Sequence, residues 1–109
     1  MICPKCGTDE LAGGMGAFGV EVDRCGSCGG VWLDKGELGV YFKDASKFDA
    51  ALGEALKTAK ASFRRCPRCV KDMLAARLEK AGVELDSCPN CSGLWLDKGE
   101  FDELKKALR

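Results

Sequence analysis

Cysteine is the residue type in this sequence with the most distinctive chemistry. The chain of 109 residues has eight cysteines and no histidine. The cysteines read Cys-x2-Cys-x18-Cys-x2-Cys twice, at Cys3, Cys6, Cys25, Cys28, Cys66, Cys69, Cys88 and Cys91. Two thiolates two residues apart can bind one metal from a single tight turn, and two such turns complete a tetrahedral zinc site. The spacing therefore predicts two Zn²⁺ ions per chain, each bound by four cysteines.

Other uses of these cysteines are open but less favoured. Disulfides belong to oxidising compartments, and the N-terminus has no apolar export signal, so we expect reduced thiols and a cytoplasmic protein. A four-thiolate site accepts iron as well as zinc. Thiolate redox or metal-transfer chemistry is a further alternative, although every Cys-x2-Cys pair already fits into a complete metal site.

The absence of histidine excludes several function classes. It removes Cys₂His₂ fingers, Cys-His and Ser-His-Asp catalysis, and histidine-based metal hydrolases. Four protein ligands leave no open position on zinc for water or substrate, so we expect structural zinc and no enzymatic activity. No apolar run approaches the ~18 residues of a membrane span, and we expect no membrane partner.

The chain contains an internal duplication. A shift of 63 residues superposes the four cysteines of each set, and Trp32–Glu37 matches Trp95–Glu100 residue for residue. A module of about 40 residues is too small to build a sufficient core alone. Structural zinc contributes on the order of 10–16 kcal/mol in finger peptides. We therefore expect each module to be unfolded without metal.

The combined motif resembles a known family. It consists of Cys-Pro-x-Cys, then Gly-Val-Glu-Val-Asp, then Cys-x2-Cys-x-Gly-Val-Trp-Leu-Asp-Lys-Gly-Glu-Leu. This pattern is similar to the transcription-factor-IIB-type zinc-ribbon family, in two tandem copies. The resemblance implies zinc binding by all eight cysteines and carries little further functional information.

The expected fold is a small metal-bound α+β protein. Zinc ribbon 1 spans residues 1–39 and zinc ribbon 2, with a C-terminal helix, spans residues 66–109. Each ribbon should contain a β-hairpin, at residues 9–24 and 72–87, because apolar and charged residues alternate there. The glycine-rich first strand of the first hairpin should be loose. Val70 and Ser92 stand where the first copy has glycine, so the second site should have less ideal turns.

The repeated Trp-Leu-Asp-Lys-Gly-Glu run predicts a helix start in each copy. Asp34 can act as the N-cap with Glu37 completing a capping box, and Asp97 and Glu100 repeat the arrangement. The tryptophans, Trp32 and Trp95, have two interpretations. They pack over the hairpins, which is favoured, or they are exposed contacts for a partner, since tryptophan is enriched at interface hot spots.

Residues 40–65 predict an amphipathic helical connector. Apolar residues recur at three- and four-residue steps from Leu38 through Ala59, and Phe63 widens the stripe. One long helix and two shorter ones are both consistent with this pattern, and a break near Ser46 is favoured. The stripe must be covered by the ribbons, by a second copy of the chain or by another protein.

The charge pattern bears on the partner. The chain has 17 basic and 17 acidic side chains, and eight thiolates with two Zn²⁺ bring the loaded protein to about −4. Residues 40–65 are the basic part. This distribution disfavours general nucleic-acid binding, which depends on clustered lysine and arginine. We therefore expect a macromolecular interaction module with a protein partner, and a nucleic-acid-associated, transcription-related factor is the alternative.

Overall fold

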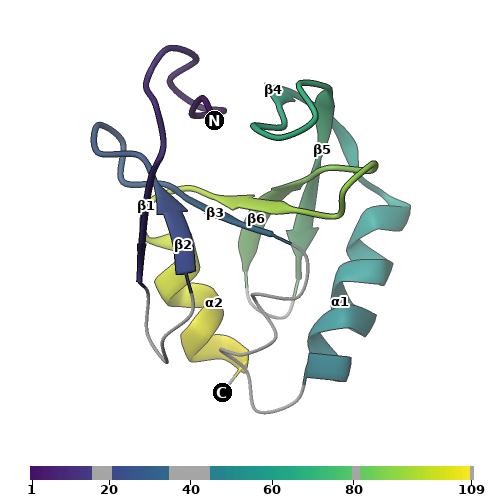
Figure 1. The fold of residues 1–109 in the computed structure, drawn as a ribbon. Coiled ribbons are helices and arrows are strands. Elements are labelled where there is room, and N and C mark those ends of the chain that lie inside the picture. The colour runs from purple at the N-terminus through teal and green to yellow at the C-terminus, as the bar shows by residue number, and fades with distance from the viewer. Residues whose placement is uncertain (16–20, 35–44, 80–81, 109) are drawn as a thin grey trace.

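The computed structural model describes residues 1–15, 21–34, 45–79 and 82–108. These residues form a small, mostly antiparallel sheet protein with two helices (Figure 1). The elements in chain order are β1 (Ala12–Met15), β2 (Glu21–Arg24), β3 (Val31–Leu33), α1 (Ala45–Lys57), β4 (Lys60–Arg65), β5 (Asp72–Leu78), β6 (Val83–Ser87), β7 (Leu94–Leu96) and α2 (Glu100–Leu108). None of the helices in these ranges is long and apolar enough to cross a bilayer.

The strands of both modules join in one seven-stranded sheet. Its order is β1-β2-β3-β7-β6-β5-β4, so β3 of the first module pairs with β7 of the second. The pairing is antiparallel, with Trp32 opposite Trp95. Because β3 and β7 are equivalent elements of the two copies, the pair has the geometry of a twofold axis inside one chain. The two ribbons therefore share one sheet.

The two faces of this sheet have different roles. Side chains alternate between the faces of a strand, and in β3 the residues Val31 and Leu33 pack in the cluster that includes Phe48 of α1 and Leu104 of α2. Trp32, between them, belongs to a second cluster with Trp95 and the cysteines. One face is thus covered by the helices, and the other supports the two cysteine sets.

The hairpins form within the expected ranges. In the first, β1 pairs with β2, and in the second β5 pairs with β6. The turn of the second hairpin contains Gly82 at a φ of 66°, a conformation that glycine adopts readily. The expectation of a loose first strand was wrong, since Ala12–Met15 is regularly paired from Ala12↔Arg24 to Met15↔Glu21.

The central segment is only partly helical. Helix α1 covers Ala45–Lys57. The prediction of helix was wrong beyond it, because Lys60–Arg65 forms strand β4. This stretch pairs with the edge of β5 at Lys60, Ala61 and Arg65, with an irregularity between Ala61 and Arg65, so tertiary pairing overrides the local apolar pattern. The helix expected after Asp34, and the continuation of α1 before Ala45, lie outside the described residues.

Candidate metal centres

The first cysteine set converges on one point. The Sγ atoms of Cys3, Cys6, Cys25 and Cys28 all lie within 4.8 Å of one another. The Cys3–Cys28 and Cys6–Cys25 Sγ distances are 3.7 and 3.8 Å. A tetrahedral ion with Zn–S bonds of ~2.3 Å requires sulfur atoms ~3.8 Å apart. These two distances match those around a bound zinc ion, and the four thiols are grouped as one tetrahedral site requires.

The second set repeats this geometry. Cys66, Cys69, Cys88 and Cys91 also lie with their Sγ atoms within 4.8 Å of one another. The Cys66–Cys91 Sγ distance is 3.7 Å. In each set the first cysteine of a Cys-x2-Cys pair is buried and the second is partly exposed. Each module thus supplies a complete four-sulfur site, and the two zinc ions predicted from the spacing are supported by the fit.

The backbone of each turn is directed at sulfur. The amide of Cys6 donates to Cys3 Sγ at 3.3 Å, and the amide of Cys69 donates to Cys66 Sγ at the same distance. In the second site the amide of Cys91 donates to Cys88 Sγ at 3.4 Å, and Asn90 Nδ2 donates to Cys69 Sγ at 3.2 Å. Such donors stabilise thiolate charge and orient the ligands.

These contacts also act on the pKa of the thiols. The backbone amide of Cys28 lowers the pKa of Cys25 to about 7. Burial opposes ionisation of Cys88, but the amides of Cys91 and Asn90 outweigh it and lower its pKa to about 7 as well. Burial raises the pKa of Cys66 to about 12. Four thiolates in so small a volume therefore need a cation, which zinc supplies on binding.

The turns of the second site are strained, as the missing glycines suggested. Gly7 and Gly29 have a φ of 77°, and Val70 and Ser92 occupy the same places with φ values of 57° and 63°. All four residues follow a cysteine pair and donate their amide to the carbonyl of its first cysteine. The left-handed region costs a non-glycine residue roughly 1–2 kcal/mol, and more for a β-branched one.

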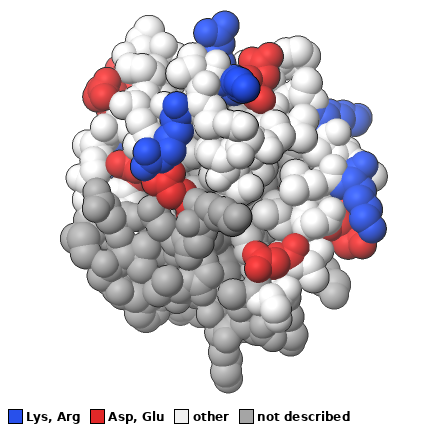
Figure 2. Space-filling view, turned by 45° about the vertical axis from the view of Figure 1, so that its right-hand side comes forward, with Lys and Arg blue, Asp and Glu red and all other residues white. Residues whose placement is uncertain are grey.

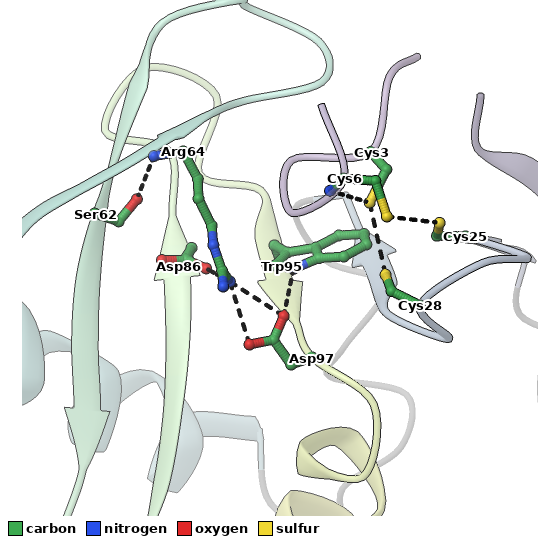
Figure 3. A network of polar contacts seen from close by, with 9 residues as sticks. All are labelled: Cys3, Cys6, Cys25, Cys28, Ser62, Arg64, Asp86, Trp95 and Asp97. Atoms are coloured by element: carbon green, nitrogen blue, oxygen red, sulfur yellow. Dashed lines mark hydrogen bonds and ion pairs between the residues drawn. The ribbon is translucent and has the colours of Figure 1, made fainter. Parts of the chain in front are cut away.

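The tryptophans connect the two centres. Both indoles are fully buried, so the interpretation of Trp32 and Trp95 as exposed partner contacts is wrong for this fold. Each ring also lies against the other module. A Cβ built on Gly30 would be 2.2 Å from Trp95 Cζ2, and one on Gly93 would be 2.2 Å from Trp32 Cζ2. In Figure 3 the ring of Trp95 points toward the cysteines of the first centre.

The carboxylates of Asp34 and Asp97, which were expected to cap helices, accept hydrogen bonds from tryptophan and arginine side chains. Asp34 accepts from Trp32 Nε1 at 3.1 Å and from Arg68 Nη2 at 2.6 Å. Arg68 lies in the second module, so this pair crosses between the copies. Glu37 lies outside the described residues, and the capping role of the first pair stays a prediction.

Asp97 precedes α2, and its backbone contacts the first residue of the helix. Its carbonyl accepts from the amide of Glu100 at 3.0 Å. Its carboxylate accepts from Trp95 Nε1 at 3.0 Å and from Arg64 Nη1 at 3.1 Å, and the same guanidinium nitrogen reaches Asp86 at 3.1 Å (Figure 3). Glu100 Oε2 is buried without a hydrogen-bond partner in the described structure. The second capping box therefore also stays a prediction.

Sequence reasoning missed the residues that join the modules. Arg64 and Arg68 were counted only as charges, and the pairing of β3 with β7 was not foreseen. A usable signal was present in Val31-Trp32-Leu33 and Leu94-Trp95-Leu96, since continuous apolar triplets are typical of strands buried on both faces. The glycines before each triplet marked the close approach.

The comparisons with known proteins agree with the site geometry. The sequence matches the family described as transcription factor zinc-finger, of the TFIIB zinc-ribbon type, over residues 2–43 and 65–107. The chain belongs to this family. Its two matches confirm two tandem zinc ribbons, and each spans one complete cysteine set. No significant match was found among curated proteins or among solved structures.

Proposed function

We propose that the chain is a protein-binding module whose two zinc centres are structural and not catalytic. Each centre already has four sulfur ligands, which leaves no coordination position for a substrate. The metals support the turns, the turns support the sheet, and the surface of the sheet and its loops makes the contact with a partner.

One observation carries the proposal toward a protein partner. The large apolar side chains exposed among the described residues are Ile2, Phe63 and Val70, with exposed fractions of 43%, 86% and 64%. All three line one surface groove of about 470 Å³. Single exposed apolar residues are ordinary, but a contiguous group is typical of interaction sites. We infer that this groove is where a partner binds.

Charge favours protein over nucleic acid. Arg64 is paired with Asp86 and Asp97, and Arg68 with Asp34, so these guanidinium groups already have partners. Figure 2 shows acidic and basic side chains interspersed over the described part of one face. Phosphate recognition needs clustered, available cations. Arg64 and Arg68 are therefore not available for the phosphate contacts that the transcription-related, nucleic-acid-binding alternative requires.

Site-directed photocrosslinking in the cells that make the protein tests the proposal. A photoreactive amino acid replaces Phe63, whose side chain projects into solvent, and the control carries it at Glu54, an exposed position on α1. We expect one protein to be crosslinked from position 63 and not from position 54. Crosslinking to nucleic acid from position 63, or no difference between the two positions, would contradict the proposal.

A further inference from the structure

We propose that the groove binds an acidic protein segment that carries an aliphatic anchor. This inference rests on the proposed function and specifies its partner. The groove, hereafter the knuckle groove, lies between the first cysteine turn of each module. Its lining is Met1, Ile2, Cys3, Pro4, Gly7, Phe63, Arg65, Cys66, Pro67 and Val70. Both modules therefore contribute to one surface.

The centre of the knuckle groove is apolar. Pro4 and Pro67 are equivalent residues of the two copies, and Ile2, Phe63 and Val70 add exposed hydrocarbon around them. A volume of about 470 Å³ is within the range of sites that bury a ligand of several side chains. An apolar side chain of a partner would remove this hydrocarbon from water, which is favourable in proportion to the area buried.

Two of the groove residues are exposed at a conformational cost. Phe63 has a φ of 61° and Val70 a φ of 57°, in a region that bulky and β-branched residues rarely adopt. The first module uses Gly7 at the place of Val70, so the turn itself does not require valine. Strain of this kind persists where another role maintains it. Contact with a partner is a role that accounts for apolar side chains at both strained positions.

Charge at the rim specifies the partner. Arg65 lines the groove, and no acidic side chain does so among the described residues. Lys5 and Lys71 are exposed and follow the lining residues Pro4 and Val70 in the sequence. In the described part of the chain none of these three cations has an ion pair. The carboxylate of Glu10 is already paired with the N-terminal ammonium of Met1 at 2.8 Å. Acidic residues of a partner would therefore pair at the rim.

The charge of the zinc centres determines where the apolar residue of the partner would lie. Cys3 and Cys66 form the floor of the knuckle groove, and each loaded zinc centre below it carries a formal charge of about −2. An acidic side chain at the centre would be repelled there. The complementary segment thus has an aliphatic residue in the middle and acidic residues on both sides of it.

Binding of defined peptides to the zinc-loaded full chain tests this inference. The probe is a fluorescent synthetic peptide with leucines at its centre and glutamates at both ends. The comparison peptides have lysine for glutamate or serine for leucine, and a single-stranded oligonucleotide represents nucleic acid. We expect saturable binding of the first probe and about tenfold weaker binding of each of the others, the size of a typical hot-spot loss.

A pair of glycine variants separates binding from folding. Val70→Gly relieves strain and removes the apolar side chain, so we expect higher thermal stability together with about tenfold weaker peptide binding. Ser92→Gly relieves the equivalent strain in a turn that does not line the groove. It should gain a smaller stability, because serine is not β-branched, and it should bind the peptide like the wild type. Arg65→Gln should weaken binding of the acidic peptide and should not weaken binding of the lysine peptide, because it removes a cation that attracts glutamate and repels lysine.

The outcomes also separate this inference from the proposed function. Equal binding of the acidic and basic peptides, tighter binding of the oligonucleotide, or unchanged binding by Val70→Gly would overturn the inference. If position 63 still crosslinks one protein in cells, the proposed function stands and only the partner chemistry is wrong. If both experiments fail, the groove is not a binding surface.

Discussion

The indole of Trp95 lies directly against the backbone of Gly30. A Cβ at Gly30 would be 2.2 Å from Trp95 Cζ2, and the reciprocal contact joins Gly93 to Trp32. Each module therefore completes the environment of the other module's second cysteine turn. This exchange, together with the β3–β7 pair, explains how two small ribbons form one sheet.

Gly30→Ala should be strongly destabilising. The added methyl group clashes with the fully buried ring of Trp95, so we expect a loss of about 2–3 kcal/mol in the free energy of unfolding. Denaturant unfolding of the zinc-loaded protein measures it. Gly26→Ala is the matched control, because a Cβ there meets nothing within 4 Å. Similar losses in the two variants would show that the close contact is unimportant.

The Arg64 guanidinium should be a stabilising link between β4, β6 and the start of α2. It reaches Asp86 and Asp97, and Asp86 is a buried residue. Arg64→Ala leaves that carboxylate without its cation, which should cost about 2–3 kcal/mol, allowing for partial solvent screening. Arg65→Ala, at the neighbouring exposed position, should be nearly neutral. The ion pair carries no stability if the two variants unfold at the same denaturant concentration.

Glu100 should lower stability at neutral pH. Burial, followed by the charges of Asp97 and Glu84, raises the pKa of its carboxyl from 4.5 to about 7. A raised carboxyl pKa means that ionisation opposes folding, so the penalty is absent below pH 4.5 and complete above about pH 7. Glu100→Gln should thus be more stable by about 1–2 kcal/mol at pH 8, after allowance for solvent screening.

Unfolding of Glu100→Gln and the wild type across this pH range checks the sign. The competition between zinc and protons for the thiols is common to both proteins, so the difference isolates Glu100. The gain should shrink to nearly zero by pH 4.5. A difference that is constant with pH would contradict the raised pKa.

Loss of one zinc ion should loosen the other. Cys28→Ser removes a ligand of the first centre, and Trp95 packs on Gly30 two residues further along that turn. We expect the remaining zinc to transfer to a chromogenic chelator about tenfold faster than in the wild type, as for sites coupled through shared packing. Ser27→Ala is the control in the same turn. An unchanged rate from the second centre would mean that the modules are energetically independent.

The sequence was informative wherever local spacing decides the structure. The two cysteine sets, the hairpins and the difficult turns at Val70 and Ser92 follow from residue types a few positions apart. Metal geometry reduces the alternatives at these places, because four thiolates at this spacing have few other uses.

Contacts between distant segments could not be read in the same way. The pairing of Trp32 with Trp95 joins residues of different copies. The sequence of one copy does not indicate which of its strands will pair with the other copy. Phe63 was assigned to a helical stripe because short apolar patterns fit both helix and strand. The open edge of β5 decided the outcome for Lys60–Arg65.

X-ray absorption at the zinc edge, combined with metal analysis, tests the central claim most directly. The claim is that the chain holds two closed four-thiolate zinc centres. The protein as isolated should contain two zinc ions per chain, each with four sulfur neighbours at ~2.3 Å and no oxygen or nitrogen neighbour. A spectrum with a light-atom ligand, or a content of one zinc ion per folded chain, would contradict it.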